Sequence, residues 1–528
     1  MCWPEPQACR IGGLHAQVRA CPGRGRSRDR GDRADGRIGG RHRVGLSWTS
    51  ESVAPGVTVE VGVLQGASAP FWTVTIDAPA TNSLTGQPAV AELGPQQWAQ
   101  DTAERLGAAG YQPRVDAVDW PAFADTPRGS EGFRVRTGDY TTQADALAAV
   151  ATQKAAGFST AAAEWTGFDA DQAPDAERVQ VAVIDPRTFH GSVAATHDGT
   201  VARREVTSTI AAKTGALVAV NGGFFVTSDA DGYQGVPSGL AVYDRRLESE
   251  SVGARAALVL GRRSAQIENL VSTVTVRAGE SGHSVEGVNR KPGVVRDCGR
   301  PGLSPTSRPR QDFTCTSSDE LVLFTAEFGA PLPTGPGAQV VLDAHGGVVS
   351  AGDRGGSVPA GDSVVQGVGA SASWLAEHAP VGAHVAVDGQ IRDAGSGARV
   401  HPDGIVSAAP VLLRQGRLAI DGDTEGVIDV HDLSFGYAWA EQRQPRTMAG
   451  IDRDGRLLLV TVDGRQPGTS EGVTIEEGAR LMRELGAVDA MNLDGGGSSA
   501  MAVDGMLVNH PSDSTGERPI GDAVVVLQ

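Results

Sequence analysis

The 528-residue sequence has no apolar run long enough to cross a membrane as a helix, and no apolar segment of the kind found in a secretory signal peptide. Aromatic residues make up only 5% of it, whereas glycine occurs 70 times, which is typical of a β-rich protein with many tight turns. The net charge of −17 disfavours nucleic acid as the main partner. We therefore predict a globular protein of two or three domains with no nucleic-acid partner and no membrane span.

Cysteine is scarce, and three of the five cysteines lie in the first 21 residues. Only Cys298 and Cys315 remain for the folded part of the chain, and a metal site would need more Cys or His ligands close by. No Asp-rich loop has the spacing of a calcium site, so we expect no metal and no cofactor. A disulfide between Cys298 and Cys315 is favoured over two free thiols, and it would imply export.

Residues 1–50 differ from the rest of the sequence, because ten Arg and no Lys occur between Met1 and Arg43. A disordered leader or a wrongly assigned start codon is favoured over a cationic arm that binds nucleic acid. With the true N-terminus lying elsewhere, we expect a secreted or cell-wall-associated protein whose signal peptide is not visible.

Residues 71–165 predict a small ferredoxin-like domain of order βαββαβ. Strands are expected over 71–76, 111–120, 132–140 and 158–165, and helices over 96–109 and 143–156. Gly110 and Gly157 stand where helix C-caps belong. The stretch GFRVRTGDY at 132–140, followed by an Ala-rich helix, resembles the SPOR family, which implies binding of peptidoglycan glycan strands. An unrelated ferredoxin-like spacer is the alternative.

Residues 166–180 predict a linker, and residues 181–528 predict a β-rich domain with a few helices, so the fold class is α+β. The clearest helix spans 475–485. Thr474 and Glu477 form a capping box there, and Ile475, Ala479 and Met482 share one face.

Two glycine loops follow apolar runs and therefore lie at predicted strand ends. One is Asn221-Gly222-Gly223-Phe224-Phe225, and the other is the run MNLDGGGSSAM at 491–501. Asn-Gly and Asp-Gly pairs are also ordinary hairpin turns, but a turn does not need three successive glycines. Neither loop has the pattern of a Walker motif or of a dinucleotide fingerprint. Backbone N–H groups in such a loop can bind an anion, which indicates a phosphate-bearing or sugar-like substrate beside Asp494.

Three blocks together resemble the phosphodiester glycosidase family: NGGFF at 221–225, PRTMAGIDRDGRLLLVTVDGR at 445–465, and SEGVTIEEGARLMRELGAVDAMNLDGGGSSAM at 470–501. The sequence departs from the family pattern at 408–412, where Ala408 and Ala409 precede Pro410. The segment 54–61 resembles the opening strand of the glycosidase domain, so residues 51–70 are its expected first strand and the SPOR-like unit is expected to be inserted after it.

The resemblance implies cleavage of the glycosyl C1–O bond of a sugar-1-phosphodiester. Such a reaction needs a carboxylate near the anomeric carbon and positive charge or N–H donors near the departing phosphate. We expect Asp494 and Asp463 to be catalytic, although Asp463 could simply form a turn. Arg446 and Arg465 are the expected phosphate partners, because a guanidinium binds phosphate in a bidentate manner. The predicted substrate- and phosphate-binding residues are Asn221, Gly222, Gly223, Arg446, Thr447, Arg465, Asn492, Gly495, Gly496, Gly497 and Ser498.

Two functions from different classes follow from these patterns. The first is a hydrolase that acts on glycosyl phosphodiesters of cell-envelope or exopolysaccharide material. The second is a non-catalytic cell-wall protein in which residues 71–165 hold glycan. The set Asn221, Arg446, Asp463 and Asp494 favours the enzyme, because a binding remnant would not need all four.

Overall fold

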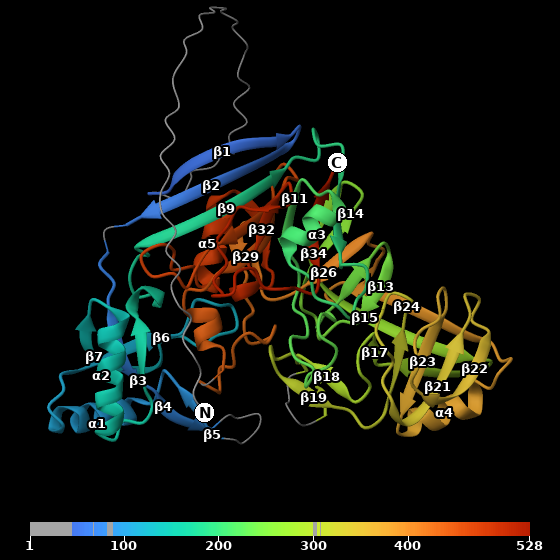
Figure 1. Cartoon of the computed structure of the whole chain (residues 1–528), viewed down its shortest axis with the longest axis horizontal. Coiled ribbons are helices and arrows are strands. Elements are labelled where there is room, and N and C mark those ends of the chain that lie inside the picture. The colour runs from blue at the N-terminus through green and yellow to red at the C-terminus, as the bar shows by residue number, and fades with distance from the viewer. Residues whose placement is uncertain (1–44, 67, 82–87, 299–303, 307, 434) are drawn as a thin grey trace, which may run out of the picture. The chain divides into compact units, whose positions relative to one another are not determined.

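An eight-stranded antiparallel sheet joins the start of the described chain to its C-terminal part. The computed structural model describes residues 45–528 except 67, 82–87, 299–303, 307 and 434, so most of the predicted leader, with Cys2, Cys9 and Cys21, lies outside the described residues. In spatial order the strands are β1 (Ser47–Ala54), β2 (Val57–Gln65), β9 (Ala176–Ile184), β30 (Leu457–Val462), β29 (Arg446–Asp452), β31 (Ala487–Asn492), β27 (Val411–Arg414) and β28 (Arg417–Leu418). β1, β2 and β9 run side by side (Figure 1), and β9 begins inside the segment predicted as a linker.

A five-stranded antiparallel sheet carries the loop that begins at Asn221. Its order is β10 (Ser192–Thr196), β34 (Ala523–Leu527), β11 (Val218–Asn221), β32 (Met501–Val503) and β33 (Met506–Leu507). The main hydrophobic core joins this sheet to the eight-stranded one, and it includes Val220, Ala449 and Met491. All residues of β11 are buried, which explains why the strand is a continuous apolar run in the sequence. Phe224 and Phe225 are buried as well.

Residues 241–407 add two larger sheets and a hairpin. The first sheet contains β13 (Arg246–Ser249), β12 (Ala241–Tyr243), β26 (Gly404–Ser407), β14 (Ala256–Gly261), β15 (Ser264–Ala278), β24 (Val385–Asp393) and β25 (Arg399–Val400), and β16 (Ser281–Val285) pairs with β15. The second contains β17 (Gly287–Val288), β20 (Glu320–Phe324), β23 (Ser363–Val368), β21 (Gly335–Leu342) and β22 (Val348–Arg354). Helix α4 (Ala370–His378) packs on the second sheet through Leu375. β18 (Val294–Arg296) and β19 (Thr314–Thr316) form a separate pair.

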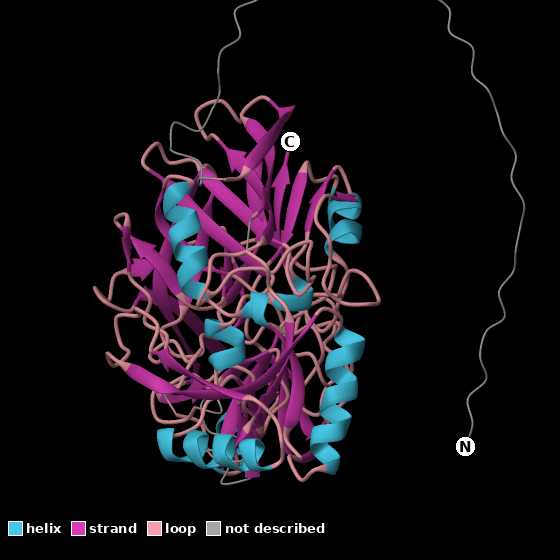
Figure 2. Cartoon of the chain, turned by 90° about the vertical axis from the view of Figure 1, so that its left-hand side faces the viewer, coloured by secondary structure: helices cyan, strands magenta, loops and turns pink. Residues whose placement is uncertain are grey.

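Residues 72–165 form a four-stranded antiparallel sheet with two helices, as the sequence predicted. The spatial order is β6 (Pro113–Asp119), β7 (Ser130–Tyr140), β3 (Trp72–Ile76) and β8 (Ala161–Trp165), which is the order of a ferredoxin-like fold. Helices α1 (Gln96–Ala108) and α2 (Gln143–Ala155) cover one face of the sheet, where Val74, Val135 and Leu106 pack together. β4 (Ala78–Thr81) and β5 (Pro88–Ala91) make a short hairpin between β3 and α1. Strands predominate throughout the described chain (Figure 2), which confirms the α+β, β-rich class.

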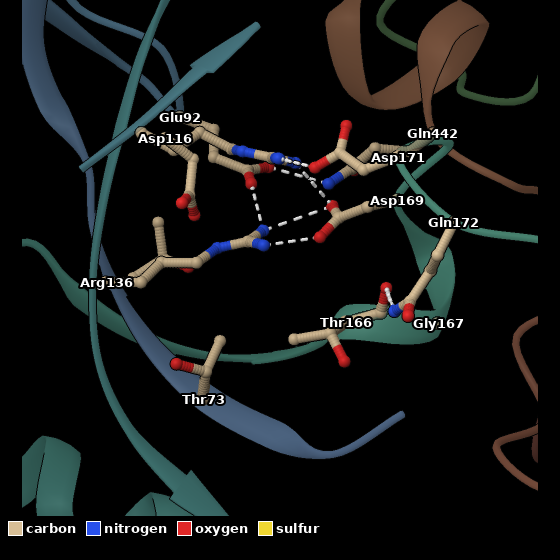
Figure 3. A network of polar contacts seen from close by, with 12 residues as sticks. Thr73, Glu92, Asp116, Arg136, Thr166, Gly167, Asp169, Asp171, Gln172 and Gln442 are labelled. Atoms are coloured by element: carbon tan, nitrogen blue, oxygen red, sulfur yellow. Dashed lines mark hydrogen bonds and ion pairs between the residues drawn. The ribbon is translucent and has the colours of Figure 1, made fainter. Parts of the chain in front are cut away.

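The other face of the four-stranded sheet is buried by charged contacts. Arg136 of β7 is 2% exposed, and Figure 3 shows its guanidinium between the carboxylates of Glu92 and Asp169. Arg134 of the same strand, 1% exposed, also pairs with Asp169 at 2.8 Å. Asp169 follows the short helix η1 (Thr166–Phe168), within the predicted linker. This sheet face is therefore occupied by the chain itself.

The same network reaches a helical turn that lies next to the candidate site. Gln442 donates a hydrogen bond of 2.7 Å to Glu92, and Arg134 donates one of 3.3 Å to the Tyr437 hydroxyl. Tyr437 begins the π-helical turn η2 (Tyr437–Glu441), which also contains Trp439. The ferredoxin-like unit is thus bonded to the segment that precedes Arg446.

Two helices lead into the strands that end at the glycine loops. Helix α5 (Ile475–Glu484) has the predicted capping box, and its buried residues Ile475, Ala479 and Met482 face the eight-stranded sheet. Helix α3 (Thr207–Thr214) ends at Gly215 with a φ of +65°, a conformation that glycine adopts without steric cost. Each helix is followed within a few residues by a short buried strand, β31 after α5 and β11 after α3.

The predicted disulfide between Cys298 and Cys315 is present. Replacing both cysteines with serine should lower the free energy of unfolding by about 3 kcal/mol, because the cross-link restricts a loop of this length in the unfolded chain. Urea unfolding of the oxidised protein and of the double variant would measure the difference. Equal midpoints would show that the loop is held by its other contacts alone.

None of the helices in the described part of the chain combines the length and the apolar character that a membrane span requires.

Candidate functional site

The two glycine loops lie against each other and are joined by their backbones. The Asn221 side-chain amide donates to the carbonyl oxygen of Asp494 at 2.8 Å, and the Asp494 N–H donates to the carbonyl of Gly222 at 3.0 Å. Residues 221 and 494 are 273 positions apart, so this contact depends on the pairing of β11 with β32 and of β31 with β29. The structure brings the two predicted loops into one site.

Asn221 is enclosed by protein on all sides. Its side-chain oxygen accepts hydrogen bonds from the Thr447 hydroxyl at 2.6 Å and from the Ala500 N–H at 3.1 Å, and the residue is 0% exposed. These bonds connect β11 to β29 and to the second glycine loop. Asn221 and Thr447 were both expected to bind substrate. In the structure their side chains hydrogen-bond to each other and connect β11 to β29.

Asn492 holds the strand end that precedes Asp494. Its N–H donates to the Pro410 carbonyl at 3.0 Å and its side-chain amide donates to the Ala409 carbonyl at 2.8 Å. The segment 408–412 is where the sequence departs from the family pattern, and the Ala409–Pro410 peptide bond there is cis. The side-chain oxygen of Asn492 is buried without a hydrogen-bond partner among the described residues.

Asp494 is partly buried, and its carboxylate accepts a hydrogen bond of 2.9 Å from the N–H of Gly495. Removal from bulk water raises the pKa of Asp494 to about 7, although hydrogen bonds from Ser498 and Gly495 act in the opposite direction. A carboxyl group that titrates near neutral pH can exchange between a nucleophilic or basic form and an acidic form under physiological conditions.

The glycines after Asp494 leave space that the side chains of Arg465 and Arg518 occupy. Gly496 has a φ of +60°, and a Cβ atom at Gly497 would lie 2.2 Å from a terminal nitrogen of Arg518 and 2.3 Å from Asp513. A Cβ atom at Gly496 would lie 3.3 Å from a terminal nitrogen of Arg465. The three-glycine loop therefore allows two guanidinium groups to approach the backbone next to Asp494.

Arg446 is a buried cation that pairs with no carboxylate in the described part of the chain. It is 1% exposed and donates to the Val473 carbonyl at 3.1 Å and to the Trp439 carbonyl, and its guanidinium lies 4.7 Å from the centre of the Trp439 ring. One terminal nitrogen, Nη1, has no hydrogen-bond partner among the residues that the structure describes. Burial, together with the nearby charge of Arg465, lowers the pKa of Arg446 to about 9. An anion that accepts a hydrogen bond from Nη1 would satisfy this donor and would also offset the cost of burying the charge.

Arg465 and Arg518 complete a group of three arginines at the loop. Arg465 donates to the Gln444 side chain at 2.5 Å, and Arg518 pairs with Asp513 at 2.8 Å. Burial lowers the pKa of Arg465, and the charge of Arg518 lowers it further. Like charges gathered around glycine N–H groups create a positive potential that favours a bound anion.

Asp463 lies at the end of β30 and is 1% exposed. Its carboxylate accepts bonds from the N–H of His510 at 3.1 Å and from the Gln180 amide at 3.4 Å, and it pairs with the His510 ring nitrogen Nδ1 at 3.2 Å. Burial raises the pKa of Asp463. The His510 side chain is 59% exposed, so the buried carboxylate orients an imidazole that faces solvent.

Four residues of the site were missed in the sequence. His510 and Arg518 contact the predicted residues, while Asp522 accepts a bond of 2.8 Å from the N–H of Gly223 and fixes the first glycine loop. Asp312, at the end of the disulfide-bridged loop, lies near enough for its charge to raise the pKa of Asp494. No spacing signal marks these residues, because each reaches the site through long-range packing.

Part of the chain is similar to known phosphodiester glycosidases. The family model for phosphodiester glycosidase matches residues 337–527. Mouse N-acetylglucosamine-1-phosphodiester alpha-N-acetylglucosaminidase is 41% identical over 110 residues, which are 21% of this chain and 21% of the mouse protein. The human enzyme of the same name is 40% identical over 68 residues, 13% of each chain. The matched part therefore spans about a fifth or less of the length of these relatives.

Two solved structures resemble the chain over most of its length. A candidate exported protein from Burkholderia pseudomallei K96243 is 32% identical with a TM-score of 0.78, and the match covers 94% of this chain and 99% of that one. A hypothetical protein from Synechocystis shares the fold alone, at 17% identity and a TM-score of 0.52, over 93% of this chain and 81% of that one. From the family model, the related stretches and the near full-length relative together, the chain belongs to the phosphodiester glycosidase family.

Proposed function

We propose that the protein is a hydrolase that cleaves the glycosyl C1–O bond of sugar-1-phosphodiesters. The observation that carries this proposal is the buried Arg446, whose Nη1 has no partner in the described part of the chain, next to Arg465 and Arg518 at the glycine loop of Asp494. A phosphate group is the ligand that three guanidinium groups and backbone N–H donors suit best. A carboxylate beside a phosphate site matches the chemistry of a glycosyl phosphate ester.

In the proposed reaction the phosphate monoester departs from the anomeric carbon. Arg446, Arg465 and the N–H group of Gly497 would stabilise the negative charge that develops on it, because the N–H groups of Gly495 and Gly496 already donate to Asp494 and Pro445. Asp494 would act in its ionised form, either as nucleophile at the anomeric carbon or as base for the attacking water. Because a phosphate monoester leaves more readily than a sugar alcohol, little general-acid assistance is needed.

A panel of substrates tests this function in the full chain. Methyl phosphate diesters of N-acetylglucosamine, glucose, galactose and mannose, as both anomers, would be compared with the matching methyl glycosides, which lack phosphate. We expect free sugar from at least one diester at a rate at least about 100-fold above its glycoside, because only the diester engages the arginines. In ¹⁸O-labelled water the label should enter the sugar and not the phosphate. Label in the phosphate, or equal rates with the glycosides, would reject C1–O cleavage of phosphodiesters.

The pH dependence of kcat/KM should be bell-shaped. A carboxylate with a pKa of about 7 becomes active as pH rises through 7, whereas an arginine with a pKa of about 9 loses its charge as pH rises through 9. Activity on the best diester should therefore peak between these values. An Arg446→Lys variant should move the alkaline limb and leave the acidic limb in place. An acidic limb centred near pH 4 would contradict a catalytic Asp494.

Asp463 is proposed to act through His510. Asp463→Asn should lower kcat by about 10- to 100-fold, since an amide in place of the carboxylate would not hold the imidazole ring in the same orientation. His510→Gln should lower kcat by a similar factor, and the double variant should be no worse than either alone. Steady-state kinetics of the three variants would test the coupling. Additive losses, or an unchanged kcat in His510→Gln, would separate Asp463 from the imidazole.

The cellular setting is proposed from two observations. The Burkholderia protein, 99% of which is covered by the match to this chain, is described as a candidate exported protein. The Cys298–Cys315 disulfide suits an oxidising compartment. We place the substrate in cell-envelope or exopolysaccharide material on this basis.

The alternative of a non-catalytic wall-binding protein would rely on residues 71–165. The strand face that carries Arg134 and Arg136 is already covered by Glu92 and Asp169, so glycan would have to bind the helical face or the sheet edges. Release of no sugar from any diester, together with retention of peptidoglycan glycan strands in a pull-down, would favour this alternative.

A further inference from the structure

A groove of about 860 Å³ lies between β13 and β24 on one side and the loops after β20 and β21 on the other. Its volume is within the range of sites that bind small organic ligands. None of the described residues that line it takes part in the site around Asp494. The groove is therefore a second concave surface with its own chemistry.

The floor of the groove is aliphatic and its rim is polar. Val242, Leu342 and Ile391 are buried side chains of the floor, and no Trp, Tyr or Phe is among the described residues that line the groove. His345 lies on the exposed rim, and its N–H donates to Asp343 at 2.8 Å. A ligand that fits must present both C–H groups and many hydrogen-bonding groups.

Glu248 of β13 is a fully buried carboxylate with a free oxygen in the groove lining. One of its oxygens accepts bonds from the Asn289 side chain at 2.8 Å and from the Thr325 hydroxyl at 2.5 Å. The other oxygen has no hydrogen-bond partner within the described chain and lies 3.8 Å from the exposed Arg246 side chain. A buried acceptor without a donor costs free energy, so a ligand hydroxyl that donates to this oxygen would be stabilised.

The charges of the groove nearly cancel. Four carboxylates and three arginines line it, and Arg246 already pairs with Glu327 at 2.7 Å. This balance favours a neutral ligand over a polyanion such as a phosphate polymer. In the part of the chain that the structure describes, no three His, Cys, Asp or Glu side chains converge as they would around a metal ion.

We propose that this groove binds a neutral, hydroxyl-rich oligosaccharide at a place separate from the Asp494 site. Sugar hydroxyls both donate and accept, so they suit carboxylates, histidines and arginines in alternation, while the C–H faces of the rings suit the aliphatic floor. The proposal does not depend on hydrolysis and would hold for a catalytic or a non-catalytic protein.

Calorimetric titration of the full chain tests the groove with four probes: chitotetraose, cellotetraose, maltotetraose and a neutral octapeptide. We expect one-to-one binding of at least one tetrasaccharide and no binding of the peptide. Ala326→Trp, which places a large side chain at an exposed position of the groove, should raise Kd at least tenfold. Glu248→Gln should also raise Kd about tenfold, because an amide nitrogen at the position of the free oxygen cannot accept a bond from the ligand hydroxyl.

Two control variants make the outcome specific. Val349→Trp adds the same side chain at an exposed position of β22 outside the groove and should leave Kd unchanged. Asp494→Asn should bind the tetrasaccharide as tightly as the parent, which separates the groove from the proposed catalytic site. Binding of no tetrasaccharide, binding of the peptide alone, or an equal Kd in Ala326→Trp and Val349→Trp would each overturn the proposal.

Discussion

Replacing Asp494 with Asn is expected to lower kcat/KM for the best sugar-1-phosphodiester by at least about 10³-fold while making the folded protein more stable. The loss follows because the amide can act neither as nucleophile nor as base. The gain in stability follows from the raised pKa of Asp494, about 7 in the folded protein against an ordinary value of 3.8. Between these values the folded state binds a proton that the unfolded state releases, so stability falls as pH rises to 7 and stays lower above it.

The neutral amide introduced by Asp494→Asn removes this penalty. At pH 8 the variant should have a higher free energy of unfolding, by on the order of 1–3 kcal/mol after allowance for the partial exposure of the site. At pH 4 the two proteins should unfold alike. Thermal unfolding at both pH values, together with the hydrolysis assay, measures the two effects in one pair of proteins.

Asp504→Asn is the matched control for this experiment. It makes the same chemical change at an exposed turn between β32 and β33, where φ is +48° and Asn is well tolerated. It should alter neither the rate nor the stability beyond about 0.5 kcal/mol. Loss of activity accompanied by loss of stability in Asp494→Asn would assign Asp494 to the structure and not to the chemistry.

The second large effect is expected in the buried charge network, where Arg136→Met should lower the free energy of unfolding by about 3–5 kcal/mol. Arg136 is 2% exposed and lies between two carboxylates, Glu92 and Asp169. Removing the cation leaves buried Glu92 without its ion-pair partner, while Asp169 keeps only its pair with Arg134. Urea unfolding of the parent and the variant would give the difference.

Arg114→Met on the neighbouring strand β6 is the control, because Arg114 forms ion pairs with Asp116 and Asp139 in an exposed setting, with 39% of its side chain accessible. Exposed pairs contribute little, so this variant should stay within about 1 kcal/mol of the parent. An Arg136→Met variant as stable as Arg114→Met would show that the buried carboxylates accept protons or water at little cost.

The sequence predicts local structure well where one segment contains the whole signal. The helix at 475–485 is set by the capping box of Thr474 and Glu477 and by the spacing of its apolar residues, and these are local features. The ferredoxin-like unit is predicted for the same reason, since its strands and helices alternate in a single stretch of the chain.

The parts of the site that depend on distant partners were not predictable in this way. Asp463 was predicted to be catalytic, with a turn residue as the alternative, but its partner His510 lies 47 positions further on and carries no motif. Arg446 was expected to be a phosphate ligand, yet its stacking on Trp439 depends on a π-helical turn that no local pattern indicated. α4 was missed because its short sequence, ASASWLAEH, has only two buried residues.

The pairing of β2 with β9 has a consequence for the evolution and engineering of the chain. Gln65 leaves the eight-stranded sheet directly opposite Ala176, where the chain enters it again, and Gly66 is hydrogen-bonded to Asp175. Everything between these points is a closed excursion that starts and finishes at the same place. A two-residue turn could connect the same two strands in register, whereas removal of the excursion would also break the hydrogen bonds of Gln442 with Glu92 and of Arg134 with Tyr437.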